Sequence, residues 1–187
     1  RVDVNLDEIG LKQAELLGKY LSELKLNAIY SSPLRRALDT ANIIARYQNI
    51  GVEVTDGLID FNYGEWQGLP DQEVRKLYSA LHSRWHNEPH LVRMPGGGSL
   101  SDVRERANSV INDVTSKYKG RVALVSHRVV NKVLICSLLG LDNSHFWDIK
   151  QDICGITIFD YINGRFILTK HNDTSHLKGI QKSLSDF

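Results

Sequence analysis

Short apolar runs of strand character alternate with amphipathic helical stretches along most of this chain, and this order restricts its fold more than any other feature. The clearest strand is 121–126, whose apolar centre suits a position buried on both faces of a sheet. A second buried strand is predicted at 27–31 and a weaker one at 52–55. Strands that are separated by helices pair in parallel, so the pattern predicts an α/β domain.

The first two predicted helices carry recognisable start signals. Asp7 is predicted to cap a helix that ends near Leu24. Ser32 and Pro33 are predicted to be the cap and the first residue of a helix that ends near Tyr47.

Two later helices are marked in the same way. Ser99 and Asp102 form a start like a capping box for a helix that runs to about Lys119. A helix over 130–139 is predicted to end at Gly140, because glycine readily adopts the left-handed conformation that closes a helix.

The last quarter of the chain changes to β character. Two β-rich runs, 153–161 and 166–170, flank Asn163 and Gly164, which together are a strong hairpin signal. The whole order predicts a three-layer α/β sandwich, with a mostly parallel central sheet, helices on both faces and an antiparallel edge.

The stretch 57–98 is less regular and is rich in glycine and proline. It is predicted to be an insertion that carries one helix over 72–86 and covers one end of the sheet like a cap. Neither a repeat nor a linker interrupts the chain, so 1–187 is predicted to be a single domain.

Charge and hydropathy exclude two classes of partner. The formal net charge is +1 and the basic residues are spread among acids, which gives no footprint for nucleic acid. No apolar run approaches the length of a membrane span. A cytoplasmic protein is expected. Because the chain starts at Arg1 and not at a methionine, a removed targeting segment is the alternative.

Arg36 lies in the predicted first turn of the second helix. The free N–H groups and positive dipole end disfavour a cation there, and a bound anion would resolve the conflict. Arginine suits a phosphate, which it grips through two N–H groups. A solvated pair formed by Arg35 and Arg36 is the alternative reading.

His127 directly follows the strand at 121–126, at the edge where ligands of such sheets bind. An imidazole there can transfer a proton or hold a phosphoryl oxygen. A hydrogen-bonded structural histidine is the alternative.

Asp60 lies between these segments and close to Phe61, Tyr63 and Trp66. A carboxyl group among aromatic rings can be desolvated enough to act as an acid. A solvated loop acid is the alternative.

In combination these segments resemble the histidine phosphatase superfamily, also called the phosphoglycerate mutase-like family, along nearly the whole chain. The similar segments are the first helix at 6–14, the arginine motif at 31–41, the acid loop at 58–68, the Pro-Gly-Gly region at 95–100 with Arg106, the second histidine motif at 125–127 and the closing segment at 172–177. Gly98 stands where the family usually has an acid.

The resemblance implies roles for five residues. Arg36 would bind the phosphoryl group, His127 would be the second histidine of the pocket, and Asp60 would be the acid, where glutamate is usual. Arg128, where glycine is common, either adds a charge for phosphate binding or crowds the pocket. Arg1 is expected to touch the substrate, and the family chemistry requires no metal ion or other cofactor.

The family nucleophile is a histidine in an Arg-His-Gly motif at the end of the first strand, and this chain does not contain that motif. We expect the native protein to carry it upstream of residue 1, on the central strand of the sheet. A chain without that strand should expose a wide apolar slot and fold poorly.

The compact insertion favours a phosphatase that acts on a small phosphorylated metabolite. A cofactor-dependent phosphoglycerate mutase and a non-catalytic phosphoester-binding pseudoenzyme are the alternatives. Trp85, Arg93 and three insertion histidines, His82, His86 and His90, either line the outer pocket or lie on the surface of the cap. Homodimerisation through the hairpin edge is left open.

Overall fold

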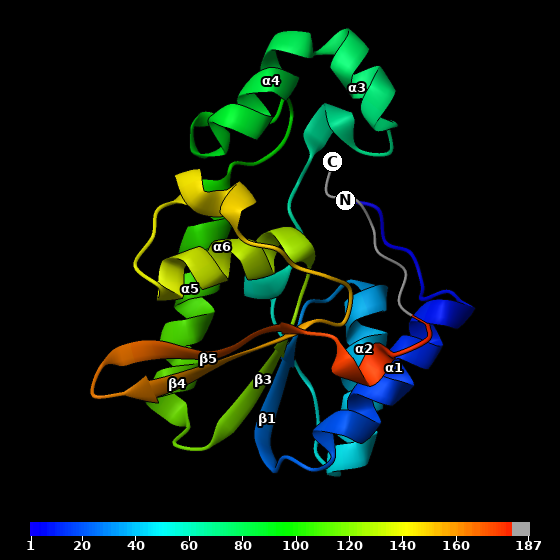
Figure 1. Cartoon of the computed structure of the whole chain (residues 1–187), viewed down its shortest axis with the longest axis vertical. Helices are drawn as coiled ribbons and strands as arrows, with labels where there is room; N and C mark the ends of the chain where they lie inside the picture. Colours follow the sequence, from blue (N-terminus) through cyan, green and yellow to red (C-terminus); the bar gives the residue numbers. More distant parts are fainter. Residues whose placement is uncertain (181–187) are drawn as a thin grey trace.

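The structure, a computed structural model, describes residues 1–180; positions 181–187 of the predicted domain lie outside the described residues. It contains a parallel sheet and a separate antiparallel hairpin (Figure 1). The parallel sheet has the order β2-β1-β3, with β1 at Leu26–Ser31, β2 at Glu53–Val54 and β3 at Arg121–Val125. The hairpin joins β4 (Ile156–Ile162) to β5 (Arg165–Asp173).

Helices pack on both faces of the parallel sheet, as predicted (Figure 1). Ile29 of β1 packs among residues of the first two helices, whereas Tyr30 packs with residues of the last two. The helices are α1 (Glu8–Leu21), α2 (Arg35–Gln48), α3 (Asp71–Leu77), α4 (Ser79–Asn87), α5 (Leu100–Lys117) and α6 (Arg128–Leu138). None of the helices within residues 1–180 has the length and apolar character needed to cross a membrane.

Several helix starts and the hairpin turn lie where the local sequence predicted them. The Asp7 side chain accepts a hydrogen bond from the Gly10 N–H at 2.7 Å and caps α1. Ser99 and Asp102 complete a capping box at the start of α5. The hairpin turn has φ of 51° at Asn163 and 78° at its glycine neighbour, the conformation that an Asn-Gly turn favours.

The predicted cap of α2 is wrong. The helix begins at Arg35, and its N-cap, Leu34, makes no side-chain capping bond. The Ser32 hydroxyl accepts from the Leu34 N–H at 3.3 Å and lies 2.7 Å from the Nε2 atom of His127. The Ser32 side chain, which the local sequence predicted to cap α2, therefore contacts His127 instead.

The predicted helix over 72–86 is also wrong, because two shorter helices, α3 and α4, meet at Tyr78. Tyr78 leaves helical geometry, with φ of −129° and ψ of 39°. Its hydroxyl donates to a carboxylate oxygen of Glu65 at 2.8 Å, and its ring packs against Trp66. These tertiary contacts hold the residue at the break.

A cleft of about 1600 Å³ separates β3 from β4. Its apolar walls include Leu17, Leu134 and Ile158. In the described chain β3 pairs with β1 alone and β4 with β5 alone, so each strand presents an edge without a strand partner. The core of β3 is only half-buried, whereas most of β1 is fully buried. The cleft has the character of the apolar slot that the sequence predicted.

The insertion is anchored to the body of the domain by aromatic packing around Trp85. This side chain is 2% exposed and stacks on Phe61, with ring centroids 5.6 Å apart. The indole N–H of Trp147 donates to the Trp85 carbonyl oxygen at 2.7 Å. Figure 1 shows the resulting position of α3 and α4 beyond one end of the sheet.

Replacing Trp85 with alanine should lower the free energy of unfolding by about 3–5 kcal/mol, because the change empties a site in a packed aromatic cluster. Urea denaturation measures the loss. Leu77→Ala is the control, since Leu77 is 64% exposed and should cost less than about 0.5 kcal/mol. Equal losses for the two variants would contradict a role for Trp85 in anchoring the insertion.

Candidate active site

The site lies at the end of the parallel sheet where the carboxyl ends of β1 and β3 lie side by side. The parallel register places Ser31 beside Val125, and the Ser32 N–H donates to the Val125 carbonyl at 3.0 Å. His127 follows β3 and is the N-cap of α6. This pairing brings His127 and Ser32 together and points the starts of α2 and α6 at the same edge.

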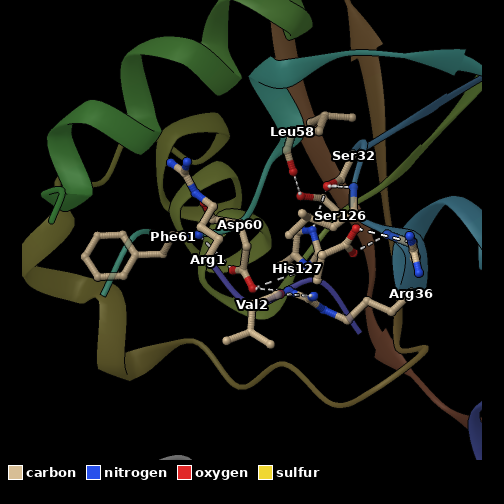
Figure 2. Close-up of polar contacts among 12 residues, drawn as sticks. Arg1, Val2, Ser32, Arg36, Leu58, Asp60, Phe61, Ser126 and His127 are labelled. Atoms are coloured by element: carbon tan, nitrogen blue, oxygen red, sulfur yellow. Dashed lines mark hydrogen bonds and ion pairs between the residues drawn. The ribbon is translucent and has the colours of Figure 1, made fainter. Parts of the chain in front are cut away.

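Arg36 and Asp60 form the central ion pair of this edge (Figure 2). The Nη2 atom of Arg36 lies 2.5 Å from Oδ2 of Asp60, and its Nη1 donates to the Val2 carbonyl at 3.1 Å. The neighbouring Arg35 has an exposed side chain, whose Nε atom lies 3.6 Å from Oδ2 of Asp3. Only the second arginine of the predicted pair therefore enters the site.

The loop that carries Asp60 is shaped by close backbone contact with the Pro95–Gly98 run. The Glu65 N–H donates to the Pro95 carbonyl, and the Gly98 N–H donates to the Asn62 carbonyl, both at 2.9 Å. Gly64 has φ of 56°, and a Cβ atom there would lie 1.9 Å from the Pro95 oxygen. Glycine is required at this position for the loop to close.

His127 is held as a neutral imidazole. Burial is the main cause that lowers its pKa to about 4, and the positive charges of Arg36, Arg106 and Arg1 lower it further. Asp60 opposes the shift, with Oδ2 at 3.5 Å from the His127 Nδ1 atom. This contact joins an acidic side chain to an uncharged ring.

Arg106 is a site residue that the sequence analysis did not assign a role. It lies on α5 and donates to the carbonyls of Gly57 at 2.8 Å and Asp60 at 3.2 Å. Burial lowers its pKa to about 10, so it stays charged at neutral pH. Its spacing from Val103 and Val110 on the buried face of α5 is the sequence signal that could have identified it.

The other predicted residues take different positions. Arg1 donates from Nε to the Asp60 carbonyl at 2.7 Å and so reaches the site. Arg128 is the first residue of α6, and its charge acts on Tyr63 and Lys132. Arg93 pairs with Asp102 through both terminal nitrogens at 2.9 Å.

Trp85 is a core residue and does not line the outer pocket in the free chain. Within residues 1–180, the group of side chains spaced to hold a metal ion lies in the α3–α4 cap and includes none of the residues at this edge.

The charges of the site favour an anion. Three guanidinium groups, those of Arg1, Arg36 and Arg106, act on His127, against one carboxylate, that of Asp60. The excess of positive charge lies at the start of two helices, where N–H groups also attract anions. The site can bind an oxyanion, and it holds a carboxyl group beside that anion for proton transfer.

Comparisons with known proteins agree with this geometry. Residues 1–174 match the family model of the histidine phosphatase superfamily, branch 1. Phosphoserine phosphatase 1 of Hydrogenobacter thermophilus is 37% identical over 177 residues, which are 94% of this chain and 84% of that protein.

Two solved structures are similar as well. YhfR of Bacillus stearothermophilus has a TM-score of 0.88 at 29% identity, covering 94% of this chain and 88% of that one. A phosphoserine phosphatase mutant of Entamoeba histolytica, solved in complex with phosphoserine, has a TM-score of 0.77 at 27% identity, with the same coverage of 94% and 88%.

The lowered pKa of His127 predicts a specific acid sensitivity. An unfolded chain binds a proton at this histidine below about pH 6.5, whereas the folded chain resists it until about pH 4. The stabilisation is complete above pH 6.5 and declines as pH falls through this window. The His127→Gln variant should therefore lose stability less steeply than wild type in this window, as measured by urea unfolding at several pH values.

His145→Gln controls for the loss of an imidazole, because His145 lies outside the site and contacts Asp148 at 2.9 Å. Parallel stability–pH curves for wild type and His127→Gln would show that the lowered pKa is wrong.

Proposed function

This chain belongs to branch 1 of the histidine phosphatase superfamily, and we propose that it is a metal-independent phosphatase of small phosphomonoesters that works through a phosphohistidine intermediate. The nucleophilic histidine in this proposal lies upstream of residue 1. The observation that carries the proposal is the convergence of Arg36, Asp60, Arg106 and His127 at one edge of the sheet.

The phosphoryl group of the substrate binds where the Asp60 carboxylate now meets Arg36. A phosphate oxygen takes the Arg36 N–H group that bonds Asp60 at 2.5 Å in the free chain. His127 and the Arg106 charge face the other oxygens. Cations fixed in position stabilise the charge that spreads over these oxygens during phosphoryl transfer.

The chemistry proceeds in two displacements. The substrate binds as its monoanion, and its phosphate proton moves to the Asp60 carboxylate as the phosphate takes the place of Asp60 on Arg36. A nitrogen of the upstream histidine then forms a bond to phosphorus while the ester P–O bond breaks, and Asp60 gives this proton to the leaving oxygen. The alcohol departs, and Asp60 takes a proton from a water molecule that attacks the phosphohistidine. The N–P bond breaks, inorganic phosphate leaves, and the histidine is restored.

The cleft between β3 and β4 supports a position for the nucleophilic histidine at the end of a further strand. A strand in this cleft would hydrogen-bond to both free edges and bury the apolar walls. A strand parallel to β3 would have its carboxyl end beside that of β3, which Ser126 and then His127 follow. Arg36, Asp60 and His127 line the same cleft, so a histidine at the end of that strand would meet the bound phosphoryl group.

Phosphoserine is the first substrate to test, because a relative and a structural neighbour are phosphoserine phosphatases. Sugar phosphates and phosphoglycerates complete the panel. Cytoplasmic location and dimerisation through the β4–β5 hairpin remain predictions.

The decisive experiment uses the native protein with its upstream segment, in EDTA. Asp60→Asn should lower kcat/KM for phosphoserine by about 10²–10⁴-fold, because this parameter reports the first displacement, in which an alkoxide must be protonated as it leaves. The loss should be much smaller for p-nitrophenyl phosphate, whose phenolate leaves without a proton. Rapid quenching without acid should trap the acid-labile phosphohistidine in wild type and in Asp60→Asn.

Asp56→Asn is the matched control, since Asp56 is an exposed acid at the start of the same loop. This variant should have the wild-type kcat/KM for both substrates. An Asp60→Asn loss of kcat/KM that is equal for both substrates would refute the role of Asp60 as acid. Absence of turnover and of phosphoenzyme across the panel would favour the phosphoester-binding pseudoenzyme.

Arg36→Ala should weaken inhibition by inorganic phosphate by at least about tenfold, because charge-assisted hydrogen bonds of about 1.5–3 kcal/mol are lost. Arg35→Ala is the control, because Arg35 lies on the same helical turn but contacts Asp3. Inhibition constants for phosphate measure both effects. Equal weakening by the two variants would contradict direct phosphate binding by Arg36.

A further inference from the structure

The α3–α4 cap carries a cluster of metal-binding side chains that the proposed reaction does not use. Asp71 is the first residue of α3, and His82 and His86 lie on α4. Residues four positions apart share one face of a helix, so both imidazoles face the same side. All three side chains are half-buried, which leaves them open to an ion from solvent.

The distances are close to those of a metal site. One ligand atom from each residue lies within 4.8 Å of the others. The Nε2 atom of His82 lies 2.8 Å from Oδ1 of Asp71, and the two imidazole centroids are 4.7 Å apart. Tetrahedral zinc with bonds of about 2.0–2.1 Å places its ligand atoms about 3.3 Å apart. Small side-chain rotations therefore convert the hydrogen bond into coordination.

Aromatic residues fix the orientation of both imidazoles. The His86 ring is stacked on Trp147, with centroids 5.0 Å apart and planes at 20°. The His82 ring packs against Trp66 at 6.2 Å. Rings that are held in place lose little freedom on binding an ion, which favours coordination.

The side-chain types of the cluster suit a divalent cation. Two imidazoles and one carboxylate are a ligand set that zinc accepts, with a fourth position left for water.

We propose that Asp71, His82 and His86 bind a Zn²⁺ ion that ties the start of α3 to α4. The ion would bridge the two helices across the break at Tyr78 and rigidify the cap. None of the three ligands belongs to the proposed phosphoryl site, so the ion has a structural role and the inference does not depend on the proposed function.

Zinc binding is tested on the full chain after treatment with EDTA and removal of the chelator. Calorimetric titration should show one equivalent of saturable Zn²⁺ binding, and zinc should raise the thermal unfolding midpoint. Cobalt at the same site should give the intense visible absorption of tetrahedral Co²⁺. His82→Gln and His86→Gln should each weaken zinc binding by at least about tenfold, because each removes a ligand.

His145→Gln is the matched control, because His145 pairs with Asp148 at 2.9 Å and, among residues 1–180, belongs to no group of three spaced to hold a metal ion. It should bind zinc as wild type does. Asp71→Asn keeps the size of the side chain and a hydrogen-bond partner for His82, so it separates folding from coordination. Metal-free melting of every variant verifies that it is folded.

Two results would overturn the proposal. The first is the absence of saturable zinc binding to the wild-type chain. The second is zinc binding that both histidine variants retain at wild-type affinity. In either case the contact between Asp71 and His82 is only an ion pair between two helices.

Discussion

The parallel pairing of β1 with β3 is the constraint on which the site depends. It sets Ser31 beside Val125, and the next residues of both strands then meet at one edge, where Ser32 contacts His127 at 2.7 Å. Helices α2 and α6 start directly beyond that edge. A shift of the register would separate these groups, because side chains alternate between the faces of a sheet. The sheet therefore sets the relative positions of Ser32, His127 and the starts of α2 and α6.

Electrostatic compensation then determines how the site is held in the free chain. Asp60 pairs with Arg36, and backbone carbonyls of its loop accept hydrogen bonds from Arg106. Positive charge still exceeds negative charge, and burial keeps His127 neutral. Such a site favours an anion, since an incoming dianion gains contacts that the single carboxylate does not satisfy. The same positive charges would stabilise a transferring phosphoryl group once it takes the place of Asp60 on Arg36.

Much of the architecture could be read from local patterns. The strand at 121–126, the Asp7 cap, the capping box at Ser99 and the Asn163-Gly164 turn were predictable because each rests on a few neighbouring residues. The helix starts at 35 and 128 and the break at Tyr78 were missed. These positions depend on partners far away in sequence, namely the contact of Ser32 with His127 and the bond from Tyr78 to Glu65.

The sequence by itself determined the order of the elements, the family resemblance and the identity of Arg36, Asp60 and His127 as candidates, because these follow from residue types and spacing. Only the tertiary structure decided that these three side chains meet, that Arg106 joins them, and that Arg35 does not. The physical reason is that charge balance and burial at a site are sums over residues that folding brings together, and no local segment contains that information.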